Sequence, residues 1–278
     1  MIGHRLVYWF DSSGTQGQIS LNAVPIEVAP LLRSLLFDRP IPIALTSATL
    51  AVTDKLDYYM QRIGLDQGER HILTSPFDFQ QQARTFISKD MPPPSDSEAF
   101  AFACRQKLEE LISITQGKAF VLFTSYRMLN QTADIMLPWF EANGWNLLKQ
   151  GDGLSNLRLV EEFKKDTNSI LFGTDSFWTG IDVPGEALSN VIIVKLPFAV
   201  PDHPLTQARL EKITFNGGNS FMNFSVPEAV LKLRQGVGRL IRSRTDTGII
   251  AILDSRIVTK HYGKAFLKSL PNAPIEYI

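Results

Sequence analysis

The sequence has little cysteine, no long apolar run and no net charge. Cys104 is the only cysteine among 278 residues, which excludes an internal disulfide and any zinc or iron–sulfur site built from cysteines of this chain alone. No run approaches the roughly 18 to 20 apolar residues that a membrane-spanning helix needs, and the N-terminal run is too short for a secretion signal. These absences predict a cytoplasmic protein with no membrane segment.

The formal net charge is zero, so a polyanionic partner would have to be held by a local basic patch and not by the field of the whole molecule. The four histidines are scattered without the spacing of metal ligands, and we expect no metal site. Hydrophobic residues make up 44% of the chain, which is enough for a sizeable core.

Short apolar runs alternate with amphipathic stretches from Lys118 onward. Helices are expected from 128 to 141, ending at Asn143-Gly144, and from Ser155. The apolar runs are typical of strands buried on both faces, and they are KAFVLFTSY, WNLLKQ, SILFGTD, NVIIVKLPF and GIIAILD. The alternation predicts an α/β fold with an open, mostly parallel sheet and helices on both faces.

The region before Lys118 is less regular. LVYWF and QISLNAV resemble strands, PIEVAPLLRSLLF a helix that starts with proline, and PIALTSA another buried strand. The proline-rich break MPPPSDS precedes a helix expected over 97–115, with Gly117 as its cap. We place the start of the regular domain between residues 55 and 70.

Ligands of an open parallel sheet bind at the carboxyl ends of the strands, so the residues that follow each apolar run are candidate ligand contacts. TSATL, TSYR, TDSFWTGIDVPG and AVPDHP occupy these places. Their hydroxyls and glycines, with the arginines before GIIAILD, suit phosphate oxygens. Structural alternatives remain, because hydroxyls at strand ends often cap helices and Trp178 could simply cover the core.

The stretch RQGVGRLIRSR, residues 234–244, is the strongest local signal. We expect it to end one helix that runs from Pro227 to about Arg242, although each interior glycine costs roughly 1 kcal/mol relative to alanine. The helical period puts four residues near one face, namely Gln235, Gly238, Arg239 and Arg242, while Val237, Leu240 and Ile241 can pack inward. A solvated basic face is the alternative, but the spacing favours an external anionic ligand.

Four ordered motifs carry a family resemblance. TSATL (46–50), FTSYR (123–127), GTDSFWTGIDVPG (173–185) and QGVGRLIR (235–242) resemble motifs III to VI of superfamily 2 helicases, in the DinG and XPD-like branch. The resemblance extends from about residue 20 to the end of the chain. It implies a RecA-like fold and an ATP-dependent DNA helicase that moves 5′ to 3′ along single-stranded DNA.

The resemblance also implies roles for individual residues. Arg239 and Arg242 would be arginine fingers on the phosphates of ATP, with Gln235 near the γ-phosphate or the attacking water. The remaining roles are nucleotide contacts at Gly180, Asp182 and Gly238, nucleic-acid contacts at Thr124, Ser125, Tyr126, Arg127, Thr174 and Trp178, and coupling of hydrolysis to domain motion at Thr46, Ser47 and Thr49.

The sequence contains neither a P-loop nor a DEAH box. Its two Gly-Lys pairs, at 117 and 263, are each followed by alanine. The resemblance therefore implies that the lysine and the carboxylate that hold ATP and Mg²⁺ belong to an N-terminal helicase domain, in the same polypeptide or a separate chain. Residues 1–55 would be a remnant of that first domain and 56–278 the second RecA-like domain. The alternative is a non-catalytic module that binds nucleic acid or nucleotide in a larger assembly.

Overall fold

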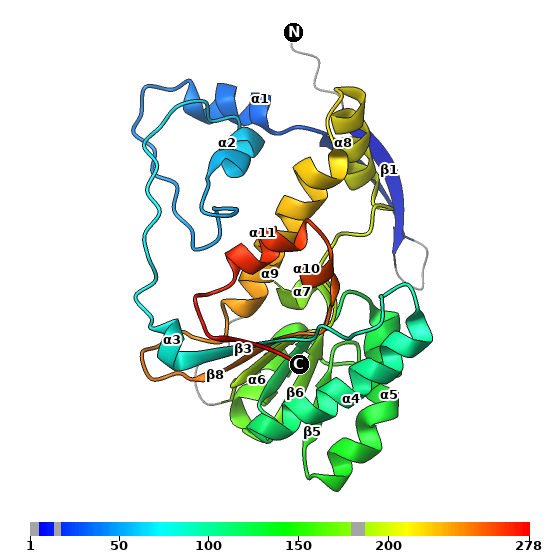
Figure 1. Ribbon diagram of the computed structural model, residues 1–278. Helices are drawn as coiled ribbons and strands as arrows, with labels where there is room; N and C mark the ends of the chain where they lie inside the picture. The colour runs from blue at the N-terminus through cyan, green and yellow to red at the C-terminus, as the bar shows by residue number, and fades with distance from the viewer. Residues whose placement is uncertain (1–5, 14–17, 179–186) are drawn as a thin grey trace. The chain divides into compact units, whose positions relative to one another are not determined.

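The structure is a computed structural model that describes residues 6–13, 18–178 and 187–278 (Figure 1). The chain divides into two compact units. Unit 1 comprises Met1–Leu73 and Phe198–Leu231, and unit 2 comprises Thr74–Pro197 and Lys232–Ile278. The predicted boundary after residue 55 divides two motor domains, which is a different division from that between these two compact units. The predicted domain boundary therefore stays a prediction.

Unit 2 is built on a seven-stranded sheet in which every pairing is parallel. The order across the sheet is β5 (Asn146–Lys149), β6 (Ser169–Gly173), β4 (Ala119–Leu122), β7 (Asn190–Ile193), β8 (Gly248–Ile252), β3 (Ala83–Ile87) and β9 (Ile275–Tyr277). The predicted open parallel sheet is therefore confirmed. Strands β3 and β9 had no counterpart in the sequence reading, because neither stands out as a long apolar run.

One face of this sheet is covered by two long helices. These are α4 (Ser97–Thr115), whose bounds match the predicted 97–115, and α5 (Tyr126–Ala142). Their apolar sides, which include Cys104 and Phe140, form one core with alternate strand residues such as Val121 and Phe172. Because the side chains of a strand alternate between faces, the intervening residues lie on the other side.

The second face of the sheet meets α7 (Asp175–Trp178) and the end of α9 (Val226–Val237). Phe177 packs edge-on against Phe120 with ring centroids 6.1 Å apart. Helices on both faces explain why the four residues of β4 are all fully buried. The remaining helices of unit 2 are α3 (Phe79–Gln82), α6 (Asn156–Lys165), α10 (Arg256–Thr259) and α11 (Gly263–Ser269).

Unit 1 contains an antiparallel hairpin and several short helices. The two runs predicted as strands form β1 (Leu6–Ser13) and β2 (Gln18–Pro25), which pair with each other to make the hairpin. The helices are α1 (Ala29–Leu32), the π-helical turn η1 (Arg33–Phe37), α2 (Asp57–Ile63), α8 (Pro204–Phe215), η2 (Phe221–Ser225) and the first half of α9. The first helix begins four residues after the predicted Pro25, because Pro25 is the last residue of β2.

Helices α1 and α2 approach closely at Gly64. A Cβ at Gly64 would lie 2.6 Å from the carbonyl oxygen of Ala29, and the glycine adopts φ +78° at the end of α2. The Arg33 guanidinium donates to the carbonyl of Gly64. Tyr58 on α2 donates to the carboxylate of Glu228 on α9, and burial together with this carboxylate raises the pKa of Tyr58. These contacts hold unit 1 together.

The strand predicted at PIALTSA is wrong. Residues 42–46 form no helix, strand or turn, and Ile41, Ile43 and Leu45 are 52%, 38% and 40% exposed. An apolar strand needs neighbours to pair with its backbone, and the described residues provide none for this segment.

Candidate functional site

The turn after β4 presents a group of exposed side chains. Thr124 is half-buried, whereas Ser125, Tyr126 and Arg127 are exposed where α5 begins. The Ser125 hydroxyl accepts the N–H of Met128 at 3.3 Å and caps the helix, so the structural alternative applies to this residue. Tyr126 and Arg127 remain accessible to a ligand at the carboxyl end of the sheet.

Thr174, at the end of β6, is held by a buried amide that sequence analysis missed. The Gln150 side-chain oxygen accepts both the N–H of Thr174 at 2.7 Å and its hydroxyl at 3.0 Å. The amide nitrogen of Gln150 donates to Ser176, which also accepts from Asn156. Gln150 directly follows β5, so its position at a strand end was the signal that could have identified it. This network fixes the start of the loop that follows β6.

The rest of that loop includes Gly180 and Asp182, which lie outside the described residues. Their proposed contacts with nucleotide stay predictions.

Trp178 is a core residue in this structure. Its side chain is fully buried, and its indole N–H donates to the carbonyl of Phe123 at 3.0 Å. An indole in this position is not available to a nucleic acid. The expectation that Trp178 faces a nucleic-acid groove is corrected, because the large apolar ring fills the space between β4 and α9.

Gly236 explains how α9 can lie so close to Trp178. A Cβ at Gly236 would lie 3.0 Å from the Trp178 ring and 3.1 Å from Leu122. The glycine therefore serves packing within unit 2, which the sequence reading did not anticipate. Its cost in helix propensity of roughly 1 kcal/mol is offset by the burial of the indole that it permits.

Helix α9 ends at Val237, five residues before the predicted Arg242. Gly238 follows the helix and donates its N–H to the carbonyl of Arg234 at 2.9 Å, so this glycine lies at a helix end and not in its interior. As expected, Val237, Leu240 and Ile241 are buried. The single helical face predicted for the arginines does not form, because the chain turns after Val237.

Arg239 turns inward. The residue is 2% exposed, its guanidinium donates to the carbonyl of Phe177, and it lies 5.4 Å from the centroid of the Phe120 ring. The guanidinium thus contacts both α7, through Phe177, and the central strand β4, through Phe120. A contact between Arg239 and a nucleotide would require this buried side chain to become accessible.

Arg242 is exposed, and its backbone is fixed by Asp246. The Asp246 carboxylate accepts the N–H of Arg242 at 2.7 Å and the N–H of Ser243 at 2.8 Å. Burial acts to raise the pKa of Asp246, but the hydrogen bonds from Ser243 and Arg242 outweigh it and the pKa is lowered. The Gln82 amide donates to the carbonyls of Ser243 and Asp246 at 2.9 Å each. These hydrogen bonds hold the backbone on both sides of Ser243 in place, and the Arg242 side chain extends from this backbone.

The structure separates two groups of predicted site residues. Thr124 to Arg127 and Thr174 follow the carboxyl ends of β4 and β6, whereas Arg242 precedes the amino end of β8. Gln235 is half-buried near the end of α9. The predicted coupling residues Thr46, Ser47 and Thr49 lie in unit 1, where the Ser47 hydroxyl accepts the N–H of Thr49 at 3.2 Å. Arg242 and the proposed nucleic-acid contacts after β4 and β6 therefore lie at opposite edges of the sheet.

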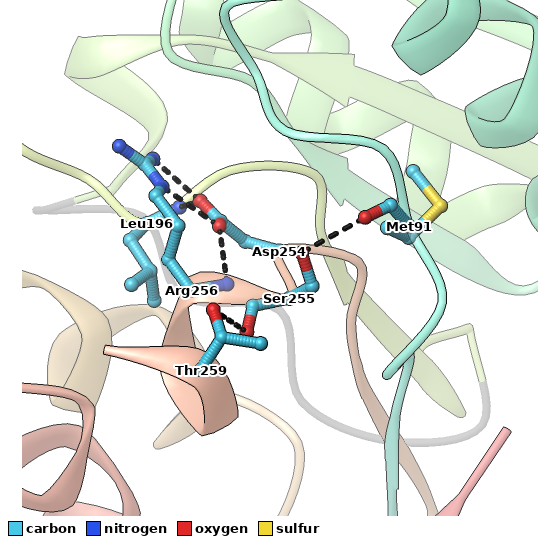
Figure 2. Close-up of polar contacts among 6 residues, drawn as sticks. All are labelled: Met91, Leu196, Asp254, Ser255, Arg256 and Thr259. Atoms are coloured by element: carbon cyan, nitrogen blue, oxygen red, sulfur yellow. Dashed lines mark hydrogen bonds and ion pairs between the residues drawn. The ribbon is translucent and has the colours of Figure 1, made fainter. Parts of the chain in front are cut away.

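A second missed residue, Asp254, joins the carboxyl ends of β7 and β8 (Figure 2). Its fully buried carboxylate accepts the N–H of Leu196 at 2.8 Å and a two-point contact from Arg256 at 2.8 and 2.6 Å. The neighbouring Ser255 hydroxyl donates to the carbonyl of Met91 at 2.9 Å. The ion pair raises the pKa of Arg256. Every one of these contacts is structural.

Neither a metal centre nor a membrane segment is found within the part of the chain that the structure describes. No group of three or more His, Cys, Asp and Glu side chains there could hold a metal ion. No helix in the same residues is long and apolar enough to cross a membrane.

Residues 108–273 match the family described as Helicase C-terminal domain. The chain is 40% identical over 266 residues to the ATP-dependent DNA helicase YoaA of Haemophilus influenzae, covering 96% of this chain and 40% of YoaA. It is 39% identical over 270 residues to the 3′-5′ exonuclease DinG of Bacillus subtilis, covering 95% of this chain and 29% of that protein. The chain therefore spans less than half the length of either relative.

A solved structure described as XPD_APO matches with a TM-score of 0.68 at 19% identity, covering 94% of this chain and 53% of that one. At this identity the likeness concerns the fold, and it agrees with the RecA-like architecture predicted from the motifs.

Replacing Gly236 with alanine should destabilise the chain even though alanine is the better helix former. The new methyl group would meet the rigid Trp178 ring at 3.0 Å, and overpacking of this kind costs about 1 to 3 kcal/mol. Urea unfolding followed by circular dichroism measures the difference. Asn130→Ala, at an exposed position of α5, also gains helix propensity but meets no clash and should not destabilise. A Gly236→Ala chain stabilised as much as Asn130→Ala would contradict the packing role.

Asp254→Asn should cost about 3 to 5 kcal/mol, because it leaves the Arg256 charge partly buried without its carboxylate. The same unfolding measurement applies. Glu162→Gln removes the exposed ion pair with Lys165 and should leave the unfolding midpoint unchanged. A midpoint for Asp254→Asn as high as that of Glu162→Gln would show that the buried pair is not a structural link.

Proposed function

The chain belongs to the helicase C-terminal domain family, and on this premise we propose that it is the second motor domain of a DinG-like, ATP-dependent DNA helicase. The observation that carries the proposal is that Arg242 is exposed while the backbone around it is held by hydrogen bonds. Asp246 and Gln82 fix the backbone around Arg242 before any ligand arrives. A guanidinium whose attachment is already ordered loses less entropy when it binds a phosphate.

In this proposal Arg242 contacts the phosphates of ATP as an arginine finger. Charge that develops on the γ-phosphoryl oxygens during transfer would be stabilised by the planar guanidinium, an effect of about 10³ to 10⁵ in rate in other phosphoryl-transfer enzymes. Gln235, at the end of α9, and Gly238, just after it, are the other proposed nucleotide contacts, together with Gly180 and Asp182. Arg239 joins them if its bond to Phe177 is exchanged for a phosphate contact.

ATP itself would be held mainly by an N-terminal motor domain. The sequence has no P-loop lysine and no DEAH carboxylate, and these groups cradle the β- and γ-phosphates and bind Mg²⁺ in such motors. The nucleotide would lie between the two domains, so that hydrolysis changes how they approach. Thr46, Ser47 and Thr49 are the proposed coupling residues.

Single-stranded DNA is the proposed nucleic acid, with 5′ to 3′ movement along it. The contacts would come from Tyr126 and Arg127, which are exposed after β4, with the Thr124 and Ser125 hydroxyls beside them. Thr174 is also a proposed contact; it is buried and hydrogen-bonded to the Gln150 amide. Trp178 is not among these contacts, because it is buried.

Replacing Arg242 tests the proposal in a complete motor. A chimera in which this chain replaces the 266 matched residues of H. influenzae YoaA, called the YoaA chimera below, would supply the missing domain. Arg242→Ala and Arg242→Lys should both lower DNA-stimulated ATP hydrolysis by about 10³, because a point charge does not replace a two-point guanidinium contact. Steady-state hydrolysis and thermal unfolding are measured side by side.

Arg244 provides the matched control for that experiment, since it is also exposed and lies two residues further along. Arg244→Ala should hydrolyse ATP within twofold of the unchanged chimera. The chain 1–278 alone should show no hydrolysis above background. Hydrolysis by Arg242→Lys at the unchanged rate, or turnover by 1–278 that Arg239→Ala abolishes, would contradict the proposal and favour a different role for the chain.

Binding of 1–278 to single-stranded DNA should be weak, insensitive to sequence and strongly reduced by salt. Contacts made mainly to phosphates give no sequence preference and weaken as salt rises, and a chain of zero net charge makes only a few of them, so the affinity is low. Fluorescence anisotropy with a labelled oligonucleotide across a salt series gives the affinity and its salt dependence.

In the same assay Arg127→Ala should weaken binding equally for all sequences, whereas Arg105→Ala, on α4 where Arg105 pairs with Glu109, should not. Tight binding that persists at high salt would argue against contacts made mainly to phosphates. Such a result would instead favour a dedicated nucleic-acid-binding module.

A further inference from the structure

Lys195, two residues after β7, is a half-buried cation in unit 2. Its ammonium nitrogen lies 4.6 Å from the centroid of the Phe100 ring on α4, and Phe100 itself is fully buried. The ammonium makes no hydrogen bond and no ion pair with any residue that the structure describes. Burial lowers the pKa of Lys195, Asp254 acts to raise it, and Arg256 acts to lower it. The protein therefore gives this charge little compensation for its partial loss of water.

The carboxylate that acts on Lys195 is already bonded to other groups. Asp254 accepts the two-point contact from Arg256 and the N–H of Leu196 (Figure 2). The Cys104 thiol, which also faces this place, is neutral because burial raises its pKa to about 12. Two cations, Lys195 and Arg256, thus share one carboxylate. The positive charge that is left over favours the binding of an anion.

Lys195 lies at the carboxyl edge of the sheet, level with Thr124. In the pairing of β4 with β7, Leu122 is opposite Ile193, and the N–H of Val194 donates to the carbonyl of Leu122 at 3.1 Å. Thr124 and Lys195 each come two residues after this pair, on neighbouring strands that lie about 4.8 Å apart. The cation is therefore placed beside one of the proposed nucleic-acid contacts.

The chain leaves β4 and β7 toward opposite faces of the sheet. After β4 it enters α5, which covers one face, and it continues to β5 and β6 on one side of β4. After β7 it returns through the end of α9, on the other face, to β8 on the far side of β7. Open α/β sheets bind their ligands where two neighbouring strands part in this way. Thr124 and Lys195 come from the two strands concerned.

We propose that Lys195 binds a phosphate of single-stranded DNA at the carboxyl ends of β4 and β7. This inference rests on the proposed function and adds a cation that lies outside the four motifs. A backbone phosphate would supply the negative charge that Lys195 and Arg256 lack, and an ammonium binds phosphate as a point charge. The strand order β6, β4, β7 then carries the contacts from Thr174 through Thr124 to Lys195 across about 10 Å, or two strand spacings.

A phosphate of ATP is the competing ligand. The position of Lys195 favours the nucleic acid, because the proposed nucleotide contact Arg242 lies at the opposite edge of the sheet. A structural role is the other alternative, in which Lys195 does no more than cover the Phe100 ring. The experiment separates these three roles.

Lys195→Met removes the ammonium and keeps an unbranched side chain over Phe100. Binding of 1–278 to labelled single-stranded DNA is followed by fluorescence anisotropy across a salt series. We expect weaker binding at low salt and a plot of log affinity against log salt that is shallower by about 0.7, the slope for one phosphate contact on a single strand. Lys195→Arg keeps the charge and should keep the slope of the unchanged chain.

Lys118→Met is the matched control, since Lys118 is also half-buried and lies at the amino end of β4, the opposite edge of the sheet. It should leave the slope unchanged. An unchanged slope for Lys195→Met, or no binding of the unchanged chain at low salt, would overturn the proposal. A lower unfolding temperature for Lys195→Met with an unchanged slope would overturn it in favour of the structural role.

The YoaA chimera separates the two kinds of phosphate. Lys195→Met should raise the DNA concentration that gives half-maximal ATP hydrolysis and leave the KM for ATP unchanged. A raised KM for ATP with an unchanged DNA requirement would overturn the proposal in favour of a nucleotide contact. A chimera that hydrolyses no ATP would refute the proposed function, whereas the salt series with 1–278 would still decide whether Lys195 contacts DNA.

Discussion

The contact between Gly236 and Trp178 is the constraint on which the arrangement of unit 2 depends. Because residue 236 has no side chain, α9 lies directly on the indole and on Leu122 of the central strand β4. The indole in turn is held by the carbonyl of Phe123, and Arg239 reaches the carbonyl of Phe177 in the same short helix. Where α9 rests therefore determines where the chain turns after Val237 and how Arg242 is presented before β8. Gly236, which allows the packing inside unit 2, therefore lies only six residues before Arg242, the proposed phosphate contact.

The sequence was sufficient to predict the parts of the fold that rest on local patterns. Continuous apolar runs identified β4 to β8, and the bounds of α4 followed from its flanking proline-rich break and its glycine. Features that depend on distant partners were not predicted. Strand β9 is short and exposed, and it becomes a strand only by pairing with β3. The segment PIALTSA was predicted as a strand from its apolar residues, but none of the described strands pairs with it.

The same distinction applies to the candidate site. Motif spacing identified Arg239 and Arg242 as a pair, but one guanidinium is buried and the other residue is exposed, because α9 stops at Val237. Gln150 and Asp254 were missed since each acts through contacts with residues more than 20 positions away, in the Thr174 and Leu196 backbones. Family membership rests on the match over residues 108–273, whereas the role of each residue remains a proposal.

The central claim is that α9 is positioned by the fit of Gly236 against Trp178, and a double-mutant cycle between these residues tests it most directly. Gly236→Ala, Trp178→Phe and the double variant would be compared by urea unfolding. If the added methyl group meets the indole, the smaller ring relieves the clash, and the double variant loses about 1 kcal/mol less stability than the sum of the single losses. Losses that add within about 0.3 to 0.5 kcal/mol would show that the two residues act independently and would contradict the account.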